Sequence, residues 1–346
     1  MSLEARIRRR LEALPERPFW GLSASTPDFT SNDYLGLTHD GIIQEILKEA
    51  PPELYRGSGA SRYLGGDAVA FHEVEGLAQA LWGKKGEKAL FFPSGLTANL
   101  AFWSSILTRE DVVIYDREVH ASIRYGIHLS GARAWGFSHN CWEEAEKKIK
   151  QAPTPPFLVI ESLYSMRGTS PDAEALKALS QRYEFYLVVD EAHTTLILPQ
   201  GKSWSSEVGL EPIARLFTFG KAAGLMGAVW IGASWLIDYL QRKGFAGIYT
   251  TALPPFIAWA IARVLQRNEE WEPRRQKLWN LIYEARTFFQ AKGIAYQGLE
   301  GPIALLPVGS YAFPLKVLHP PTVSAPACRL SLHAYNTLEE LNALIG

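Results

Sequence analysis

Two apolar segments of the chain end in residues that are suited to acid–base or covalent chemistry. Phe185-Tyr-Leu-Val-Val-Asp190 ends in a carboxylate, and Leu216-Phe-Thr-Phe-Gly-Lys221 ends in an amine. The two ends are 31 positions apart, about the length of one crossover unit. Alone, Asp190 is more typical of a helix cap and Lys221 of a solvated loop. Together they match the needs of pyridoxal phosphate, which takes a lysine amine for its Schiff base and a carboxylate beside its ring nitrogen.

A candidate phosphate site follows another apolar segment. Pro93-Ser94-Gly95-Leu96-Thr97-Ala98-Asn99 comes after Lys88–Phe92 and opens an apolar helical pattern. Backbone N–H groups at a helix start bind phosphate, Gly95 allows close approach, and Ser94 or Thr97 is suited to cap the helix. An ordinary strand-to-helix turn explains the same residues about equally well.

Other motifs carry less. His120 follows the segment that ends at Asp116, where an imidazole is placed to stack on a planar cofactor, although a lone histidine is more often structural. Gly57-Ser-Gly59-Ala-Ser-Arg62 lacks the last glycine of a dinucleotide-binding loop. Gly201-Lys202-Ser203 lacks the first glycine of a P-loop, and no G-x-S-x-G elbow is present. A nucleotide-binding α/β protein is therefore the weaker interpretation.

Composition narrows the class of protein. Of the 346 residues, 47% are hydrophobic and 21% charged, with a net charge of −1, which disfavours nucleic acid as the main partner. Cys141 and Cys328 form no C-x-x-C pair, so neither a disulfide framework nor a metal site is expected. The longest uncharged apolar stretch, Leu225 to Ile237, is too short to span a bilayer. We expect a cytoplasmic enzyme without a membrane partner.

Alternating apolar and helical segments predict an α/β fold with a mainly parallel sheet. The first 40 residues are expected to pack on a smaller domain or a dimer interface, residues 41–250 to form the large domain, and residues 251–346 to form a linker helix and a small domain. Long helical patterns run from Phe256 to about Lys292 with a break at Pro273. The expected strands are Lys88–Phe92, Asp111–Asp116, Phe157–Ser162, Phe185–Asp190, Leu216–Gly220 and Ala228–Ala233.

An ordered set of motifs over about residues 30–335 resembles the α-oxoamine synthases, fold-type I pyridoxal-phosphate enzymes that condense an amino acid with an acyl thioester. These motifs are Asn32-Asp-Tyr-Leu-Gly-Leu37, Gly57-Ser-Gly-Ala-Ser-Arg62, Phe92-Pro-Ser-Gly95, His120-Ala-Ser-Ile123, Glu161-Ser-Leu-Tyr-Ser-Met166, Asp190-Glu-Ala-His193, Thr218-Phe-Gly-Lys221 and Thr250-Thr-Ala-Leu-Pro-Pro255. The resemblance implies a large domain with a seven-stranded-type sheet flanked by helices, a small C-terminal α+β domain, and a homodimer with shared active sites.

The resemblance also implies a role for each matching residue. Lys221 would hold pyridoxal phosphate and act as acid and base, while Asp190 would face the ring nitrogen. The remaining cofactor contacts would be His193 at the ring 3-oxygen, His120 stacked on the ring, Ser165 near the 3-oxygen, Thr218 and the backbone around Ser94, Gly95 and Leu96 at the phosphate, and Thr250 or Thr251 from the partner subunit. Arg329 would bind the amino-acid carboxylate, and Asn32 would contact the substrate. If Arg329 does not bind the carboxylate, Arg17 in the basic N-terminal segment is the first alternative.

Within the family, Thr218-Phe-Gly-Lys-Ala-Ala-Gly224 followed by Gly227-Ala-Val229 favours the member that joins L-alanine to a pimeloyl thioester, carried by coenzyme A or a carrier protein, in biotin synthesis. Alternatives are another pair of substrates, such as glycine with acetyl-CoA, or a catalytically silent binding protein of the same fold. Leu96, Arg167, Thr169, Thr194 and Thr195 depart from the family pattern. The chain is also short between Gly309 and Pro320, which predicts a reduced small domain.

Overall fold

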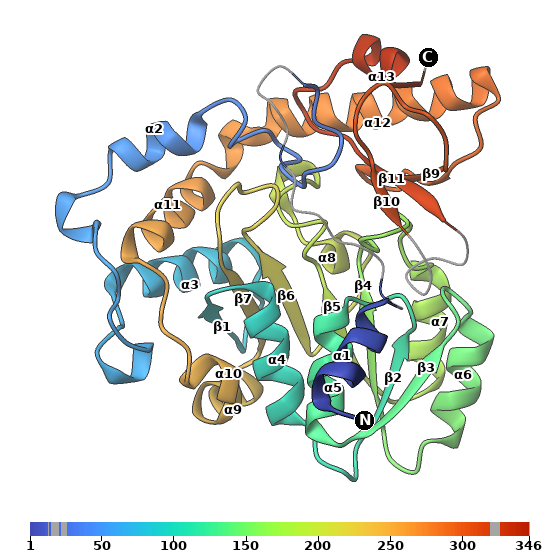
Figure 1. Cartoon of the computed structure of the whole chain (residues 1–346). Helices are drawn as coiled ribbons and strands as arrows, with labels where there is room; N and C mark the ends of the chain where they lie inside the picture. Colours follow the sequence, from blue (N-terminus) through green and yellow to red (C-terminus); the bar gives the residue numbers. More distant parts are fainter. Residues whose placement is uncertain (13, 15–20, 22–25, 319–325, 346) are drawn as a thin grey trace.

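A seven-stranded sheet forms the centre of the larger part of the molecule. The computed structural model describes residues 1–12, 14, 21, 26–318 and 326–345. The strands lie in the order β1-β7-β6-β5-β4-β2-β3, and of these seven β7 alone runs antiparallel to its neighbours (Figure 1). Their bounds are β1 Glu87–Phe92, β2 Val112–Asp116, β3 Arg133–Phe137, β4 Phe157–Glu161, β5 Tyr186–Asp190, β6 Ala214–Thr218 and β7 Ala228–Ala233. The predicted mainly parallel sheet is confirmed.

Helices cover both faces of this sheet, which explains why its strands are apolar on both sides. Along β2, Val113 packs on the face covered by α4, α5 and α9, whereas Val112 and Ile114 pack on the face covered by α6 and α7. The opposite end of that second face is covered by α3 and α11 (Figure 1). These helices are α3 Val69–Trp82, α4 Gly95–Ile106, α5 Ala121–Ser130, α6 Trp142–Gln151, α7 Ala173–Arg182, α9 Ser234–Lys243 and α11 Pro255–Gln266.

Shorter helical elements lie in the connections. They are α2 Ile42–Lys48, α8 Trp204–Glu207, α10 Phe245–Ile248 and the single 3-10 turns η1 Pro52–Leu54, η2 Arg62–Leu64, η3 Pro199–Gly201 and η4 Asn268–Trp271.

Two strand predictions need correction. The strand expected at Leu216–Gly220 is β6, which begins at Ala214 and ends at Thr218. After Thr218 the chain forms a loop, closed by hydrogen bonds from Phe219 N to Gly227 O and from Leu225 N to Phe219 O. Lys221 therefore lies on this loop, three residues past the strand. The edge strand β3 was missed because Arg133 and Ala134 are exposed, so the segment lacks an apolar run.

The break in the long helical region lies a few residues earlier than predicted. The helix α11 ends at Gln266, η4 follows, and α12 runs from Glu272 to Lys292. Pro273 stands in the first turn of α12, where the missing N–H costs no helical hydrogen bond. The interruption is therefore the η4 turn, and Pro273 starts the next helix.

A second, antiparallel sheet of four strands follows α12. Its order is β10-β11-β9-β8, with β8 Gln297–Gly298, β9 Ile303–Pro307, β10 Lys316–Leu318 and β11 Ala327–Ser331. The last helix, α13 Leu338–Ile345, packs with α12 beside this sheet (Figure 1). Residues 308–315, between β9 and β10, form no helix, in agreement with the predicted reduction.

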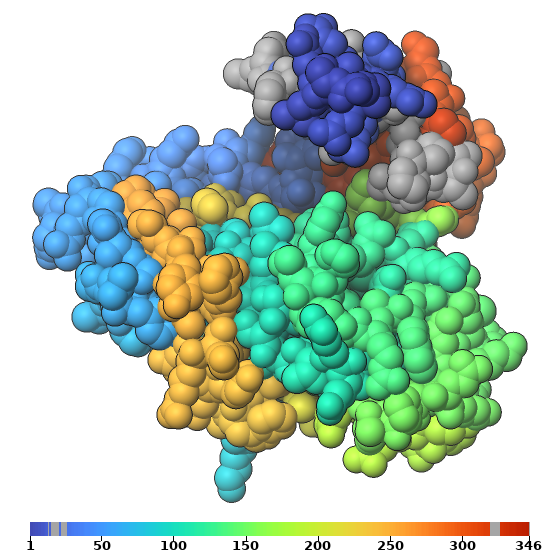
Figure 2. Space-filling view, turned by 60° about the horizontal axis from the view of Figure 1, so that its bottom comes forward, coloured from blue at the N-terminus to red at the C-terminus, as the bar shows by residue number. Residues whose placement is uncertain are grey.

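The N-terminal region contacts this second sheet by hydrogen bonds. Ser331 N donates to Phe29 O, and Ala334 N donates to Tyr34 O. Phe29 and Tyr34 are fully buried. The first helix, α1 Leu3–Glu12, has no buried residue and lies on the outside of the molecule (Figure 2). Within the described residues, no helix is both long and apolar enough to cross a membrane.

Candidate active site

The carboxyl ends of β1, β2, β4, β5 and β6 meet at one edge of the large sheet, where parallel α/β sheets bind ligands. A cavity of about 220 Å³ opens at this edge, and we refer to it as the Lys221 cavity. Its lining includes nine predicted site residues, namely Asn32, Ser94, Gly95, Leu96, His120, Asp190, His193, Thr218 and Lys221. Asn99, Ser122, Glu161, Ala192, Leu216, Gly220, Met226 and Gly227 complete it.

Lys221 extends from the loop after β6 into this cavity. Its Nζ donates to Thr218 Oγ1 at 3.3 Å. Burial lowers the pKa of Lys221, although the nearby carboxylates of Asp190 and Glu161 oppose the shift. A lowered pKa increases the fraction of neutral amine, which is the form that attacks a carbonyl group and accepts a proton.

Asp190 is held in one orientation by a donor at each carboxylate oxygen. Oδ1 accepts from Ala192 N at 3.0 Å, and Oδ2 accepts from Asn99 Nδ2 at 3.1 Å. The first contact caps the following turn, so the structural role considered from the sequence is real. The second reaches across to α4, and a simple cap does not need it. The Asp190 side chain is thus buried, oriented and presented to the cavity.

A hydrogen-bonded chain joins His120 to Asp190. His120 Nδ1 lies 2.7 Å from Ser122 Oγ, and Ser122 Oγ accepts from Asn99 Nδ2 at 3.0 Å. The same imidazole caps α5 by accepting from Ser122 N at 3.2 Å. The ring is exposed toward the cavity, which leaves it free to cover a planar group. His120 therefore caps α5, the structural role, and also lines the cavity, where its ring can face a cofactor.

Glu161, at the end of β4, anchors two segments of the site. Its carboxylate accepts from His120 N and, at 3.2 Å, from Ser165 N. Burial and the neighbouring charge of Asp190 raise the pKa of Glu161 well above its usual value. The side chain thereby fixes the backbone that carries His120 and the loop that carries Ser165.

The start of α4 fits a phosphate group. Ser94 Oγ accepts from Thr97 N at 3.1 Å, which confirms the predicted cap. A Cβ atom at Gly95 would lie 2.8 Å from Thr218 Cγ2, so glycine permits the close approach of α4 to the end of β6. Within the described residues the N–H groups of Gly95 and Leu96 have no acceptor. Two free donors at a helix N-terminus beside a hydroxyl match an anion such as a phosphate.

Arg329 reaches the site from β11 of the second sheet. Its neighbours Cys328 and Leu330 pack into the core, so Arg329 faces the opposite way. Nε donates to Ser165 O at 2.7 Å, Nη1 to Ser331 Oγ at 2.8 Å, and Nη2 to Asn32 Oδ1 at 2.9 Å. A guanidinium has five N–H groups, so each Nη keeps one more to donate. Arg329 is 4% exposed and has no ion-pair partner among the described residues, which leaves its charge available for a carboxylate.

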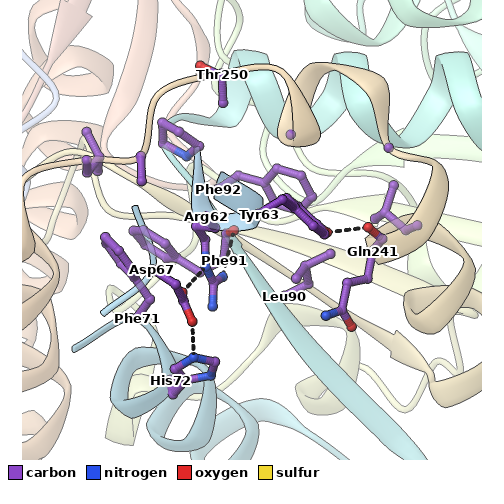
Figure 3. Close-up of a pocket in the computed structure, with 16 residues that line it drawn as sticks. Arg62, Tyr63, Asp67, Phe71, His72, Leu90, Phe91, Phe92, Gln241 and Thr250 are labelled. Carbon is purple, nitrogen blue, oxygen red and sulfur yellow. Dashed lines mark hydrogen bonds and ion pairs between the residues drawn. The ribbon is translucent and has the colours of Figure 1, made fainter. Parts of the chain in front are cut away.

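Not every predicted residue lines the Lys221 cavity. Ser165 and Arg329 are not in its lining: Ser165 N donates to Glu161, and Arg329 donates to Asn32, and these two acceptors do line the cavity. Thr250 instead lines a second cavity of about 140 Å³. The hydrogen-bonded residues Arg62, Asp67 and His72 line the same cavity at some distance from Thr250 (Figure 3). Thr251 lines neither of these two cavities. Arg17 lies outside the described residues.

Comparisons with known proteins identify the family of the chain. The model of the family "Aminotransferase class I and II" matches residues 27–325. The 8-amino-7-oxononanoate synthase of Chromobacterium violaceum is 36% identical over 92% of this chain and 87% of its own length. That of Marinobacter nauticus is 33% identical over 97% and 90%. The chain belongs to the aminotransferase class I and II family.

Solved structures show the same fold. The serine palmitoyltransferase of Sphingomonas wittichii has a TM-score of 0.87 at 23% identity, covering 99% of this chain and 94% of that one. The 8-amino-7-oxononanoate synthase of Francisella tularensis has a TM-score of 0.79 at 24% identity, covering 93% and 96%. The fold-type I architecture predicted from the sequence is confirmed.

Family membership confirms two further predictions. The chain is a pyridoxal-phosphate-dependent transferase, and the resemblance to the α-oxoamine synthases holds. The residues present fit the cofactor, because a lysine amine, an oriented carboxylate and a helix start with unpaired N–H groups border one cavity. Among the described residues no cluster of His, Cys, Asp and Glu is placed to hold a metal ion.

Sequence reasoning missed four residues of the site. Asn99 and Ser122 orient Asp190 and His120, Glu161 anchors the loops, and Tyr34 connects His193 to Asn32. Glu161 and Tyr34 stood inside quoted motifs without a role, and a buried polar residue in such a motif was the available signal. Asn99 was the last residue of the predicted phosphate segment, and its place one turn into α4 was the available signal.

Proposed function

We propose that this enzyme condenses L-alanine with a pimeloyl thioester, releasing CO₂ and the thiol and forming the amino ketone of biotin synthesis. The observation that carries the proposal is the 36% identity, over 92% of the chain, to a relative named 8-amino-7-oxononanoate synthase. Two features of the site support an amino-acid substrate. They are the buried Arg329, which has no ionic partner among the described residues, and the amine of Lys221 in the same region.

The proposed reaction gives a chemical role to each residue that lines the cofactor site. When bound, pyridoxal phosphate supplies an aldehyde for an amine to join and a ring that accepts electrons. Asp190 would keep a proton on the ring nitrogen, and the N–H groups at the start of α4, with Thr218, would hold the phosphate. His120 would cover the ring, and His193 would contact its 3-oxygen.

The substrate is bound and deprotonated by residues on opposite sides of the site. Arg329 and Asn32 bind the carboxylate of L-alanine, and the two remaining Nη hydrogens of Arg329 suit a bidentate contact. Lys221 Nζ removes the α-proton of the amino acid, a step favoured by the lowered pKa of this lysine. The same amine returns a proton to the product carbon after CO₂ has left.

We further propose a homodimer whose sites are shared. Thr250 and Thr251 do not line the Lys221 cavity of their own chain, which suits a contact with the partner's phosphate site. Leu96 and Met226, which line the cavity, are 55% and 51% exposed, and Phe245 on α10 and Tyr249 just after it are 65% and 76% exposed. Large exposed apolar side chains beside a site favour an interface.

A condensation assay tests the proposal. The purified protein, incubated with pyridoxal phosphate, is offered L-alanine, glycine or L-serine together with acyl thioesters of different chain length and terminal group. We expect the highest kcat/KM for L-alanine with pimeloyl-CoA or pimeloyl-carrier protein. Preference for glycine with acetyl-CoA would assign another member of the family, and absence of any condensation would favour a silent binding protein.

A labelling experiment tests the cofactor site independently of the substrates. The protein with pyridoxal phosphate should be yellow, and borohydride should abolish the colour and leave the label on Lys221 after peptide mapping. Lys202→Ala, which removes an exposed lysine that pairs with Glu207, is the control and should label as wild type does. A label on another lysine would remove Lys221 from its assigned role.

A further inference from the structure

Tyr34 is a fully buried phenol that lies between the cofactor side and the substrate side of the site. Its hydroxyl oxygen is 2.7 Å from His193 Nδ1 and 3.0 Å from Asn32 Oδ1. Asn32 Oδ1 in turn accepts from Arg329 Nη2 at 2.9 Å. Four side chains thus form one continuous chain of hydrogen bonds, from a histidine that lines the Lys221 cavity to an arginine on the second sheet.

The direction of each hydrogen bond in this chain follows from the arginine. Arg329 can only donate, so the Asn32 atom that it contacts must be the oxygen. Tyr34 has a single hydroxyl proton, and it must point to that oxygen, which has no proton to give. The Tyr34 oxygen therefore accepts, and His193 Nδ1 must carry the proton that it donates. Burial raises the pKa of Tyr34 to about 12, so the hydroxyl keeps its proton near neutral pH.

The charges around His193 favour its neutral form. Lys221, Arg329 and His120 lie close to it, and after burial these groups lower the pKa of His193 well below its usual value. With Nδ1 protonated and the ring neutral, Nε2 is left as a lone-pair acceptor. Because Nδ1 is directed to Tyr34, Nε2 is the nitrogen available to a group in the cavity.

We propose that Tyr34 is a positioning residue that fixes His193 as the Nδ1-protonated tautomer and couples it, through Asn32, to the carboxylate-binding Arg329. The proposal rests on the proposed function in taking Arg329 and His193 as the substrate and cofactor contacts. Filling the Arg329 site with a carboxylate then acts on His193 through two side chains. A merely structural hydroxyl would satisfy a buried partner without any effect on tautomer or on substrate affinity.

The tautomer is measured by NMR on the full chain with ¹⁵N-labelled histidine at neutral pH, before and after addition of pyridoxal phosphate. His193→Gln identifies the His193 signals among those of the eight histidines. In the wild type, long-range ¹H–¹⁵N correlations should show a protonated Nδ1 and a bare Nε2. Tyr34→Phe removes only the hydroxyl and should abolish this pattern. Tyr183→Phe removes the hydroxyl that donates to Glu146 on another helix and should leave it intact.

Amino-acid affinity is the second readout. L-alanine is titrated into the protein loaded with pyridoxal phosphate, and the change in its visible spectrum gives Kd. We expect Tyr34→Phe to raise this Kd by about 2- to 10-fold, the effect of one neutral hydrogen bond, and Tyr183→Phe to leave it unchanged. The Kd of each variant is divided by the wild-type Kd measured at the same pH, so that the effects of other titrating groups cancel.

The outcomes separate the two proposals. A wild-type His193 protonated at Nε2 overturns the role of Tyr34, even if Tyr34→Phe does not fold. An altered tautomer in Tyr34→Phe with unchanged L-alanine affinity overturns the coupling to Arg329. If the wild type gives no spectral response to L-alanine, the proposed function fails, and the NMR pattern alone decides whether Tyr34 fixes the tautomer.

Discussion

Asn99 donates from Nδ2 to Asp190 Oδ2 across 3.1 Å, and the two residues are 91 positions apart in the sequence. Asn99 lies on α4, one turn after the helix start that fits the phosphate, whereas Asp190 ends β5. One helix therefore supplies both the N-terminus that would hold the phosphate and the amide that contacts the Asp190 carboxylate. A shift of α4 would disturb both contacts at once.

Asn99→Ala should slow the exchange of the α-proton of L-alanine by about 10-fold, because Asp190 loses a donor to its charged oxygen and becomes less well oriented. Pyridoxal phosphate should still bind. Proton exchange followed by NMR measures the effect, and Ser104→Ala, which removes a hydroxyl elsewhere on α4, is the control.

Asp190→Asn should slow the same exchange far more, since a neutral amide cannot hold the ring proton. Wild-type exchange in Asp190→Asn would show that its role is misassigned.

Arg329→Ala should weaken L-alanine binding by roughly 10- to 150-fold, the equivalent of about 1.5–3 kcal/mol for a charge-assisted contact. Arg329→Lys should recover little, because a single ammonium cannot reproduce contacts with Ser165, Ser331 and Asn32 and also bind a carboxylate. Affinity for pyridoxal phosphate should hardly change. The spectral titration with L-alanine measures both variants, and unchanged affinity in Arg329→Ala would direct attention to Arg17.

Asp33→Asn should change the pH dependence of stability. Burial raises the pKa of Asp33 to about 6 from 3.8, although Oδ2 accepts from Thr38 N and His39 N. As the pH rises, the Asp33 carboxyl loses its proton in the unfolded chain before it does so in the folded chain. The contribution of Asp33 to wild-type stability therefore falls between pH 3.8 and about pH 6, and it is constant above that range. Asparagine keeps one oxygen for the two N–H groups and removes the charge.

The free energy of unfolding of Asp33→Asn, minus that of the wild type, should therefore increase by up to about 3 kcal/mol from about pH 4 to about pH 7.5. Urea unfolding at matched protein concentrations gives the free energies. Asp111→Asn replaces a surface aspartate that also accepts a backbone N–H group, and it controls for the substitution itself. A gain that stays constant over this range would exclude a raised pKa at Asp33.

Shared sites predict complementation between two impaired variants. Lys221→Ala and the double variant Thr250→Ala/Thr251→Ala should each be weak alone. Mixed in equal amounts, unfolded and refolded, they should recover about one quarter of wild-type activity, since half of the dimers are mixed and each mixed dimer has one intact site. Sedimentation verifies the dimer. A monomer with full activity, or mixed dimers without recovery, would refute the shared site.

The sequence predicted those parts of the site that local pattern controls. Asp190 and Lys221 follow apolar segments, and the helix after Ser94 begins with a cap, so their place at the sheet edge could be inferred. Residues whose role depends on contacts between distant segments were not found. Asn99, for example, stands one turn into an apolar helix, and this place gives no sign of its partner Asp190, which is 91 residues away.

The dependence on contacts between distant segments also explains the errors in the predicted strands. Thr218 and Gly220 belong to one apolar run, but only the hydrogen bonds of residues 219 and 225 close the loop that carries Lys221. The edge strand β3 has one neighbour and an exposed start, so burial left no periodic signal in its sequence. Thr250 and Thr251 depend on a second chain for their expected role, which no pattern within one chain can specify.

Arg329 is carried by the four-stranded sheet, whereas Lys221 and Asp190 belong to the seven-stranded one. Under the proposed function, recognition of the amino acid and retention of the cofactor would therefore depend on different sheets of the molecule. We expect substitutions confined to β11 to alter the choice of amino acid while leaving Lys221 and Asp190 in place, whereas changes at Asn32 or Tyr34 would also reach His193. For protein engineering, this short strand is the place to begin a search for enzymes that make new amino ketones.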